Sequence, residues 1–351
     1  MLLYLHIPYC DSKCHYCSFN SYVGRFDTRS AYMEALRKQL RFELERFAAE
    51  PASIETLFIG GGTPSTVDPE EYEPLFDLLG PFLSQDAEMT TEANPNSADE
   101  AWLRGMRALG INRVSFGVQS FDAEKLRALN RAHTPRQAIE AIETADRLGY
   151  EHLSLDLIYN FRGDTKRALL SDIDQAFSLP LDHISAYELT IEAGTHFAEQ
   201  PRKRQEDEAL ARFVAETIHE RGFTQYEISN FGRYRSRHNR GYWRLENYIG
   251  AGAGAVGFLN DTRYYPQTDI DGYIANPLKI EEESLRADEL LTEKIFLGLR
   301  SEIGIEKTLL PPAMRSRAEE LLDEKKLTFS NGSYQNPDFF LADEIALYLL
   351  G

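Results

Sequence analysis

The sequence predicts an α/β protein with a parallel sheet, followed by a smaller part that mixes helices and strands. Two observations carry this prediction. Short β-like runs alternate six times with longer helical patterns in the first part of the chain, and helical patterns near its end surround an Asn–Gly turn. Strand–helix units in succession are typical of a parallel sheet, either an open doubly wound sheet or an incomplete barrel.

The strand–helix units occupy the chain up to residue 221, with a breaker stretch at residues 192–201 inside the last one. In the first unit, a strand over residues 2–8 precedes a helix over residues 28–49, in which apolar side chains recur every three or four residues. The other units comprise residues 54–59 and 69–79, 88–92 and 98–109, 113–117 and 136–148, 152–159 and 164–177, and 183–190 and 205–221. Gly110 and Gly149 stand where a glycine commonly ends a helix.

Beyond residue 223 the alternation stops. Residues 229–265 are rich in Gly, Arg and aromatic residues without a clear period, and we expect a structured loop region there. Asn331–Gly332 is a hairpin signal between two short strands. Helices are expected at residues 289–299, 312–325 and 342–350. Helices with such a hairpin resemble a winged-helix module. We therefore divide the chain into residues 1–228, 229–284 and 285–351.

Composition and charge restrict the class of protein. The chain has 351 residues, 42% of them hydrophobic, and a formal net charge of −18. That charge opposes binding to a nucleic-acid backbone, so we expect no nucleic-acid partner. No apolar run reaches the roughly 20 residues of a membrane helix, and the N-terminus lacks the pattern of a signal peptide. We expect a cytoplasmic protein without a transmembrane segment, and peripheral membrane association stays open.

All cysteines of the chain lie in one short segment. Cys10, Cys14 and Cys17 follow the first predicted strand with the spacing C-x₃-C-x₂-C. Such a cluster indicates metal or redox chemistry rather than disulfides. One interpretation is a zinc site completed by His6 or His15. The other is a cubane iron–sulfur cluster held at three irons, whose remaining iron is open to a small molecule.

Glycines and polar residues recur at the carboxyl ends of the predicted strands, where α/β folds bind ligands. Residues 60–64, Gly-Gly-Gly-Thr-Pro, follow the second strand. Such a turn exposes backbone amides to a ligand, although close packing of two chain segments also requires glycine. Glu92, Gln119, Asp156 and Glu188 stand at the ends of later strands. Each alone is compatible with a buried polar residue satisfied across the sheet, but together they predict one site.

A basic, aromatic segment stands out in this acidic chain. Residues 232–244 contain five arginines and no acidic residue. Arginine pairs with carboxylates, aromatic rings stack on flat conjugated ligands, and His238 offers an imidazole to a metal, so a haem with its propionates fits the segment. The alternative is a solvated loop that pairs with the protein's own acidic surface. The net charge disfavours a nucleic-acid interpretation.

The cysteine segment, with Tyr16 before its last cysteine, resembles the cluster-binding loop of radical S-adenosylmethionine (SAM) enzymes. Within that superfamily, residues 4–8, 60–64, 130–134 and 248–250 resemble the oxygen-independent coproporphyrinogen III oxidases (HemN) and their relatives of the HemW family. The resemblance covers almost the whole chain. It implies an incomplete (β/α)₆ TIM-like barrel, with a [4Fe–4S] cluster on Cys10, Cys14 and Cys17 and SAM on the open iron. By motif position it implies SAM contacts from Tyr4, Tyr16, Gly61, Gly62, Thr63, Glu92, Gln119, Arg131 and Asp156.

Two departures separate the chain from the oxidases. The oxidases carry a further cysteine two residues after the third, where this chain has Phe19. They also have a long extension ahead of the cluster that helps to enclose the porphyrinogen, whereas nine residues precede Cys10 here. Radical chemistry requires such an enclosure. The HNxxYW signature, which resembles the haem-binding mark of the HemW family, is matched by His238, Asn239, Tyr242 and Trp243. The resemblance therefore favours HemW.

That family resemblance implies a haem chaperone that binds haem and the SAM-ligated cluster, delivers haem to acceptor haemoproteins and depends on an electron donor. Whether the protein is also an enzyme stays open, and oxidative decarboxylation of coproporphyrinogen III in porphyrin biosynthesis is the alternative. Residues 159–163 depart from the Gly-Leu-Pro-Gly type of turn that is usual in the family. Residues 252–257 spell G-x-G-x-x-G but follow no predicted strand, so we expect a close backbone crossing there rather than a dinucleotide site.

Overall fold

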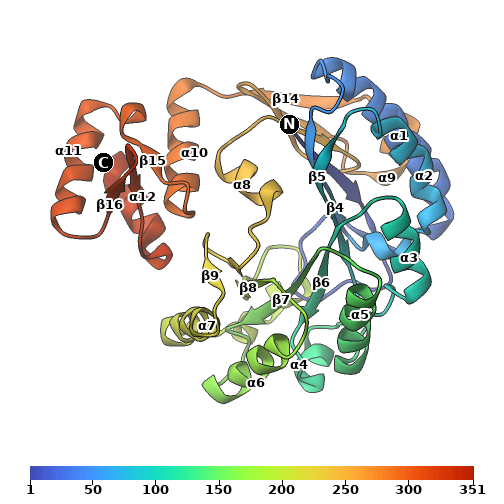
Figure 1. Ribbon diagram of the computed structural model, residues 1–351, viewed down its shortest axis with the longest axis horizontal. Helices are drawn as coiled ribbons and strands as arrows, with labels where there is room; N and C mark the ends of the chain where they lie inside the picture. The colour runs from blue at the N-terminus through green and yellow to red at the C-terminus, as the bar shows by residue number, and fades with distance from the viewer.

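One sheet of twelve strands forms the centre of the computed structural model, which describes residues 1–351 (Figure 1). The strand order is β14-β13-β12-β11-β1-β4-β5-β6-β7-β8-β10-β9. Its six predicted parallel strands are β1 (Leu2–Ile7), β4 (Ile54–Gly61), β5 (Leu83–Ala93), β6 (Arg113–Gln119), β7 (His152–Tyr159) and β8 (His183–Glu188). The curved sheet keeps two free ends, so the predicted incomplete (β/α)₆ barrel is confirmed.

The helices that follow these strands cover the outer face of the sheet (Figure 1). They are α1 (Arg29–Arg46), α2 (Pro69–Leu79), α3 (Glu100–Ala108), α5 (Pro135–Arg147), α6 (Lys166–Phe177) and α7 (Glu208–Glu220). Local signals set their starts: Thr134, for example, caps α5 in a capping box with Gln137. Helix α4 (Ala123–Ala128), capped by Asp122, was not predicted because it is too short to show a helical period.

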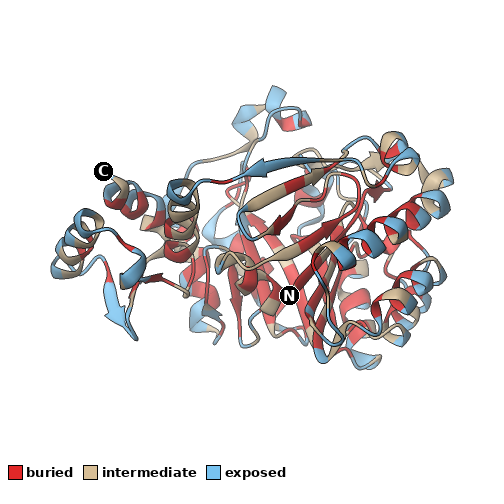
Figure 2. Ribbon diagram, turned by 90° about the horizontal axis from the view of Figure 1, so that it is seen from above, coloured by how far each residue is buried: buried red, intermediate tan, exposed pale blue.

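The two faces of the strands differ in polarity. Successive side chains point to opposite faces, so Leu3 packs beneath the helices while its neighbour Tyr4 points the other way. Figure 2 shows the buried residues concentrated on the strands and on the inner sides of the helices, where 55 of them form one hydrophobic core. On β5 and β6 the interior positions are occupied by Glu88, Glu92 and Arg113. Because buried polar groups need partners, the barrel interior is the place for a polar network or a ligand.

The expectation of a structured loop region over residues 229–265 is wrong, because the segment contains regular elements that extend the sheet. β11 (Tyr248–Ala251) pairs in parallel with β1. The other elements of this region and its flanks are β9 (Thr224–Gln225), β10 (Asn230–Gly232), α8 (Arg237–Trp243), β12 (Gly257–Leu259), β13 (Thr262–Pro266), α9 (Ile270–Ala275) and β14 (Ile280–Ser284). These strands are too short for a recognisable sequence period and depend on pairing with neighbours. α8 lies between the two ends of the open barrel (Figure 1).

Residues 252–257 directly follow β11, so the expectation that no strand precedes them is also wrong. Their glycines are required by close packing. Gly252 has a φ of +114°, and a Cβ there would lie 2.6 Å from the carbonyl oxygen of His6. At Gly254 a Cβ would lie 2.6 Å from the side-chain amide of Asn20. The segment therefore crosses β1 and the cysteine loop at close range, as expected.

The C-terminal part has a hydrophobic core of its own, with 12 buried residues. Its elements are α10 (Ala287–Leu299), β15 (Ile305–Glu306), α11 (Pro312–Asp323), β16 (Thr328–Ser330), β17 (Ser333–Gln335) and α12 (Ala342–Leu350). The predicted hairpin is confirmed: Asn331 and Gly332, with φ of 50° and 82°, connect β16 to β17. The twelve-stranded sheet contains strands on both sides of residue 228. Domain boundaries at residues 228 and 284 stay a prediction. None of the helices is both long and apolar enough to cross a membrane.

Candidate functional site

The cysteine loop is held at both ends and along its length. β2 (Tyr9–Cys10) and β3 (Tyr22–Val23) pair in parallel and close it. Within the loop, Lys13 Nζ donates a hydrogen bond to the carbonyl oxygen of Phe19 at 2.6 Å. From outside, Asn130 Nδ2 donates to the Lys13 carbonyl oxygen at 2.8 Å. The segment between α4 and α5, which contains Asn130, therefore helps to shape the cysteine loop.

Two of the three thiols accept hydrogen bonds from predicted site residues. Thr63 Oγ1 donates to Cys10 Sγ at 3.4 Å, and Arg131 Nη1 donates to Cys14 Sγ at 3.1 Å. Arg131 is itself fixed, because its Nη2 donates to Asn94 Oδ1 at 2.5 Å and to a backbone carbonyl of β6 at 2.6 Å. Donors beside sulfur favour the thiolate, which is the form that binds metals.

The donor set fits an iron–sulfur cluster better than a single zinc ion. Cys10, Cys14 and Cys17 border one cavity and supply three thiol ligands, the number that a cubane cluster held at three irons needs. His6, one candidate for the fourth zinc ligand, already has both ring nitrogens in hydrogen bonds, at 3.0 and 2.8 Å. Burial raises the pKa of the Cys10 and Cys17 thiols, so metal binding is what would keep them ionised near neutral pH.

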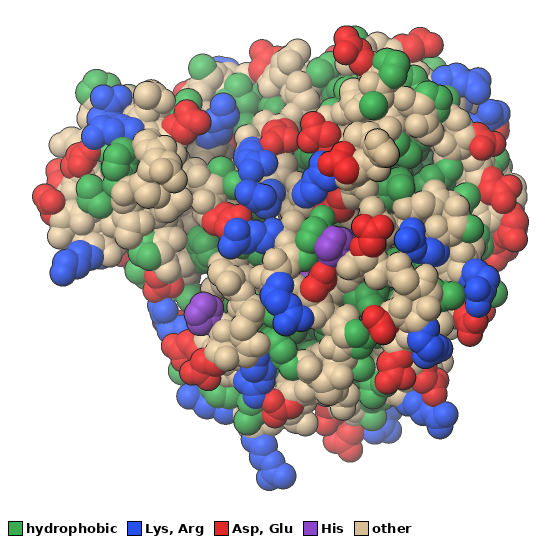
Figure 3. Space-filling model, viewed as in Figure 1, with side chains coloured by type: hydrophobic (Ala, Val, Ile, Leu, Met, Phe, Trp, Pro, Cys, Tyr) green, Lys and Arg blue, Asp and Glu red, His purple; other side chains and the backbone are tan.

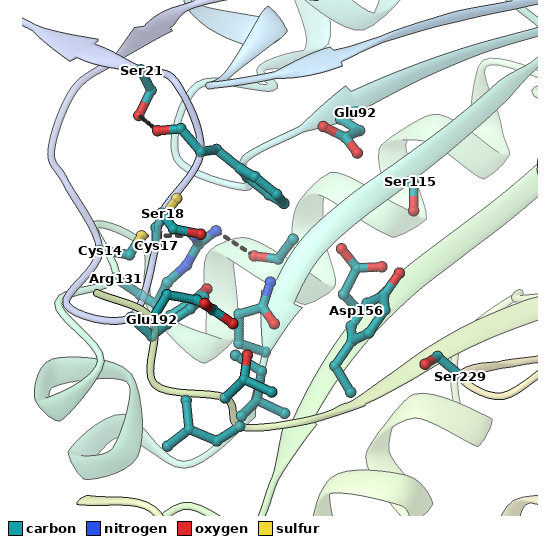
Figure 4. Close-up of a pocket in the computed structure, with 18 of the residues that line it drawn as sticks. Cys14, Cys17, Ser18, Ser21, Glu92, Ser115, Arg131, Asp156, Glu192 and Ser229 are labelled. Atoms are coloured by element: carbon teal, nitrogen blue, oxygen red, sulfur yellow. Dashed lines mark hydrogen bonds between the residues drawn. The ribbon is translucent and has the colours of Figure 1, made fainter. Parts of the chain in front are cut away.

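The predicted cluster and SAM residues meet, with one exception, in a cavity of about 710 Å³ at the carboxyl ends of the strands. Figure 4 shows Cys14 and Cys17 on one side of this cavity, Arg131 beside Cys14, and Glu92 and Asp156 on the side of the strands. The cavity is lined by Cys10, Cys14, Tyr16, Cys17, Gly61, Gly62, Thr63, Glu92, Gln119, Arg131 and Asp156, among others. Its size is that of a small-molecule site.

Tyr4 is the exception. Its side chain lines a second cavity, of about 580 Å³, together with Tyr242 of α8 and Phe19 of the cysteine loop. Phe19 lines both cavities. Tyr4 stands three residues before the end of β1, below the rim where the other predicted residues gather, and strand position therefore separates it from them.

Packing explains the glycines at the end of β4. Gly61 has a φ of +113°, and a Cβ there would lie 2.6 Å from the ring of His6. At Gly62 a Cβ would lie 2.7 Å from the carbonyl oxygen of Tyr9. The N–H of Gly61 donates to the Glu92 carboxylate at 3.1 Å. Close packing therefore explains why glycine is required at positions 61 and 62. The amide of Gly61 already has a hydrogen-bond partner.

Two carboxylates give the cavity an unusual electrostatic character. Burial, with a contribution from the charge of Asp156, raises the pKa of Glu92 to about 7. Burial likewise raises the pKa of Asp156 to about 6. Gln119 adds a strained backbone, with a φ of +70° at a break in the register between β6 and β7. Glu188 differs from these acids because Arg204 pairs with it at 3.0 Å.

The departure at residues 159–163 is accommodated by an asparagine. Asn160 has a φ of +61°, a left-handed conformation that Asn adopts more readily than most residues. Its Nδ2 donates to Glu188 Oε1 at 3.2 Å. Phe161 packs in a small core with Phe197. Asn160 thus stands in a left-handed conformation at the start of the turn, Gly163 with a φ of 98° closes it, and Tyr159 before it lines the first cavity.

A buried glutamate fixes α8 inside the barrel. Glu88 of β5 accepts hydrogen bonds from the backbone N–H groups of Arg237 and His238, at 2.8 and 3.0 Å. Burial alone would raise the pKa of Glu88, but the charge of Arg113 and the surrounding donors lower it overall. The carboxylate therefore caps the first turn of α8. Glu88 was not predicted, although it stands four residues before Glu92 and hence on the same face of the strand.

His238, the predicted haem ligand, is buried at 1% exposure. Its Nδ1 lies 2.7 Å from the hydroxyl oxygen of Thr56, while its Nε2 has no hydrogen-bond partner. Burial lowers the pKa of His238 to about 3, so the ring is neutral, as a metal ligand must be. The rings of His238 and Tyr242 meet edge to face at 4.6 Å. Asn239 and Trp243, the other predicted haem residues, are half-buried on α8.

The arginines around α8 pair with acidic residues of the protein itself. Ion pairs join Arg235 and Arg240 to Glu302, Arg237 to Asp86, and Arg244 to Glu246. Around the centre of the face shown in Figure 3, basic side chains stand next to acidic ones. The alternative considered for this segment, a basic loop paired with its own acidic surface, thus describes four of its five arginines, while Arg233 donates to the carbonyl oxygen of Leu181. An anionic ligand would have to compete with these acids.

One wall of the first cavity comes from the C-terminal part and was not predicted. Phe339, Phe340 and Asp343 line it. No local pattern marks these residues, because tertiary packing brings the start of α12 to the cavity. Asn94, which also lines the cavity and binds Arg131, could have been found, since it follows Glu92 at the end of β5.

Known proteins resemble this chain in sequence and in structure. Residues 4–176 match the model of the radical SAM superfamily. "Heme chaperone HemW" of Mycobacterium tuberculosis (strain CDC 1551 / Oshkosh) is 35% identical over 99% of this chain and 94% of that protein. The protein of the same name from Bacillus subtilis (strain 168) is 34% identical over 87% and 84%. The solved structure of coproporphyrinogen III oxidase (HemN) from Escherichia coli, 21% identical, superposes with a TM-score of 0.82 over 99% of this chain and 89% of that one. The chain therefore belongs to the radical SAM superfamily and, within it, to the HemW family.

Proposed function

We propose that this protein is a haem chaperone that binds haem and delivers it to acceptor haemoproteins. The observation that carries the proposal is that proteins named heme chaperone HemW match the chain over most of its length and of theirs. The geometry supports it, because Phe19 of the cysteine loop and Tyr242, the tyrosine of the HNxxYW signature on α8, line a common cavity. We place its action in the cytoplasm, with an electron donor for the cluster as a further partner and without nucleic acid.

Membership of the radical SAM superfamily implies a [4Fe–4S] cluster and SAM. Cys10, Cys14 and Cys17 would hold the cluster, with Arg131 and Thr63 donating hydrogen bonds to two of the sulfurs. When bound and reduced, such a cluster would supply electron-transfer chemistry toward SAM. Glu92 would face the positively charged part of SAM, since the N–H of Gly61 already fixes this carboxylate in the cavity.

The charge of the first cavity disfavours the alternative function, oxidation of coproporphyrinogen III. Its charged lining residues comprise five acids and two bases, and both bases, Lys13 and Arg131, are bound to the cysteine loop. A porphyrinogen with propionates around its ring would meet like charges there. SAM, which carries a sulfonium and an ammonium group, meets opposite charges. The first cavity is therefore better suited to SAM than to the oxidase substrate.

An anaerobic haem titration of the cluster-reconstituted protein, followed at the Soret band, tests the proposal. We expect saturable binding at one site by the wild type and clearly weaker binding by His238→Ala. Thr56→Ala is the matched control, because it removes the hydrogen bond to the same ring and leaves the imidazole in place. Equal weakening by both variants would assign the effect to packing instead of ligation.

Delivery is tested by adding an apo-haemoprotein to the haem-loaded protein and following the Soret shift as haem is transferred. Absence of saturable haem binding by the wild type would overturn the chaperone proposal. In that case, incubation with coproporphyrinogen III, SAM and a reductant under anaerobic conditions would test the oxidase alternative.

A further inference from the structure

The second cavity is a cleft between α10 and a wall formed by β1, the cysteine loop, the end of α8 and β11. Its lining is mainly apolar and aromatic and includes Tyr4, Phe19, Tyr242, Tyr248, Phe296 and Leu297. The rings of Tyr242 and Tyr248 meet edge to face, with centroids 4.7 Å apart. A cleft of about 580 Å³ with aromatic walls is suited to a flat, conjugated ligand.

The cleft and the first cavity differ in charge. Arg263 and Glu293 are the only formally charged residues of the cleft, and they bind each other through two hydrogen bonds of 3.0 and 2.7 Å. His6, which also lines it, stays neutral because burial lowers its pKa. A ligand with carboxylates is therefore opposed by the acidic first cavity but not by the cleft. In the cleft, the guanidinium of Arg263 offers such a ligand a two-pronged partner.

The cleft borders the helix that carries the HNxxYW signature. Tyr242 and Leu245, at the end of α8 and just beyond it, are lining residues. Tyr242 also contacts the ring of His238, whose Nε2 is buried without a hydrogen-bond partner. Tyr242 thus connects the cleft to the one buried imidazole nitrogen that lacks a protein partner on this helix.

We infer that this cleft, and not the first cavity, is the binding site for haem in the protein. It takes a flat tetrapyrrole against the aromatic wall of Tyr242 and Tyr248, with α10 on the other side, and a ligand carboxylate replaces Glu293 at Arg263. The inference rests on the proposed function, because it assigns a place to the haem that a chaperone must bind. It also explains why the arginines around α8 are free to pair with the protein's own acids.

Two kinds of substitution test the assignment by hemin titration of the full-length, cluster-reconstituted protein. Leu297→Trp fills the cleft and is expected to weaken binding roughly tenfold. Lys294→Trp is its control, since Lys294 lies on the same helix and does not line the cleft. Cluster absorbance and thermal melting check that each variant is folded.

The second kind changes the ion pair of the cleft. Arg263→Gln is expected to weaken hemin binding and Glu293→Gln to strengthen it, each by roughly three- to tenfold. Changes of opposite sign distinguish a direct carboxylate contact from a general loss of packing. The controls Arg286→Gln and Asp288→Asn make the same charge changes in an exposed ion pair at the start of α10. If Leu297→Trp does not fold, the variants Arg263→Gln and Glu293→Gln test the location of the haem site on their own.

Three outcomes are distinguishable. Weakening by Leu297→Trp, with opposite effects at Arg263 and Glu293 and none in the controls, supports the cleft as the haem site. Saturable binding by the wild type that none of the cleft variants changes overturns the assignment and leaves the chaperone function standing. Absence of saturable binding by the wild type overturns the proposed function, and this assignment with it.

Discussion

At Glu92, ligand binding and stability make opposite demands on one carboxyl group. The pKa of this group rises from 4.5 to about 7 on folding, mainly through burial. Between these values the folded chain binds more protons than the unfolded one, so the group's contribution to stability falls as pH rises through this window. The negative charge that would attract SAM therefore lowers the stability of the ligand-free protein.

Glu92→Gln should raise the free energy of unfolding of the ligand-free protein by about 1–2 kcal/mol at about pH 8, with part of the burial cost discounted because Glu92 borders the cavity. The gain should shrink as the pH falls from about 7 toward 4.5. Thermal denaturation at several pH values measures it. Asp86→Asn, at an exposed position of the same strand, should leave the melting temperature nearly unchanged. A gain that is equal at all pH values would contradict this explanation.

The sequence was enough to predict which polar residues at strand ends belong to the site, but not how deeply each side chain is buried. Glu92, Gln119 and Asp156 follow from the rule that ligands bind at the carboxyl ends of parallel strands, and the structure brings them to one cavity. The sequence also singled out His238, but it could not indicate that this ring is buried. Its exposure depends on how α8 packs into the barrel, which is a tertiary property.

At the scale of elements, α8 depends on a strand far away in the sequence. Glu88→Ala should lower the free energy of unfolding by about 3–5 kcal/mol, because it leaves the N–H groups of α8 and the buried charge of Arg113 without their partner. Glu88→Gln, which keeps acceptors in place, should cost less. Urea denaturation measures both, with Glu55→Gln on β4 as an exposed control. Similar losses for Glu88→Ala and Glu55→Gln would refute a capping role for Glu88.

The stabilisation by Glu88 has its own pH dependence. The folded-state pKa of this group lies below its usual value of 4.5. Its contribution to stability is therefore fully present above 4.5 and is lost as the pH falls through the lower, folded-state value. This direction is opposite to that at Glu92 on the same strand.

The hairpin of the C-terminal part offers a local test. Gly332→Ala should destabilise β16 and β17 by about 1 kcal/mol, because an L residue is strained at the positive φ of this position. Asn331→Gly should be nearly neutral, since glycine adopts the same conformation freely. Hydrogen exchange of the amides in β17 reports the local opening. Equal protection in both variants would show that the turn does not limit the stability of the hairpin.

The prediction of elements succeeded where a period was long enough to be seen. All six strand–helix units were recognised, but β9 to β14 were not, because strands of two to five residues carry too little pattern. β11 is held by its parallel pairing with β1, a contact between segments far apart in the chain. Such pairing leaves no local signal.

At the scale of the whole molecule, the C-terminal part forms one wall of the first cavity. Phe340 lines the cavity and lies against Arg212 of α7, which also forms an ion pair with Asp338 at 3.0 Å. Phe340→Ala should open the cavity to solvent and accelerate loss of the reconstituted cluster in air several-fold. Absorbance of the cluster measures the decay. Phe329→Ala, which truncates an exposed ring in the same part of the chain, should decay like the wild type.

The helices and the hairpin of the C-terminal part were predictable from the change of rhythm in the sequence, but the contribution of this part to the first cavity was not. Phe339 and Phe340 stand just before α12, and nothing in the local sequence distinguishes them from ordinary core residues. Only the packing of the C-terminal part against α7 brings them to the cavity. A site that is assembled from two parts of a chain cannot be read from either part alone.

Phe19 lines both cavities and is 65% exposed. A ligand that displaces this ring in one cavity changes the shape of the other. The two binding equilibria then close a thermodynamic cycle, in which each ligand alters the affinity of the other by the same factor. A dissociation constant measured at one cavity consequently has a defined value only when the occupancy of its neighbour is specified.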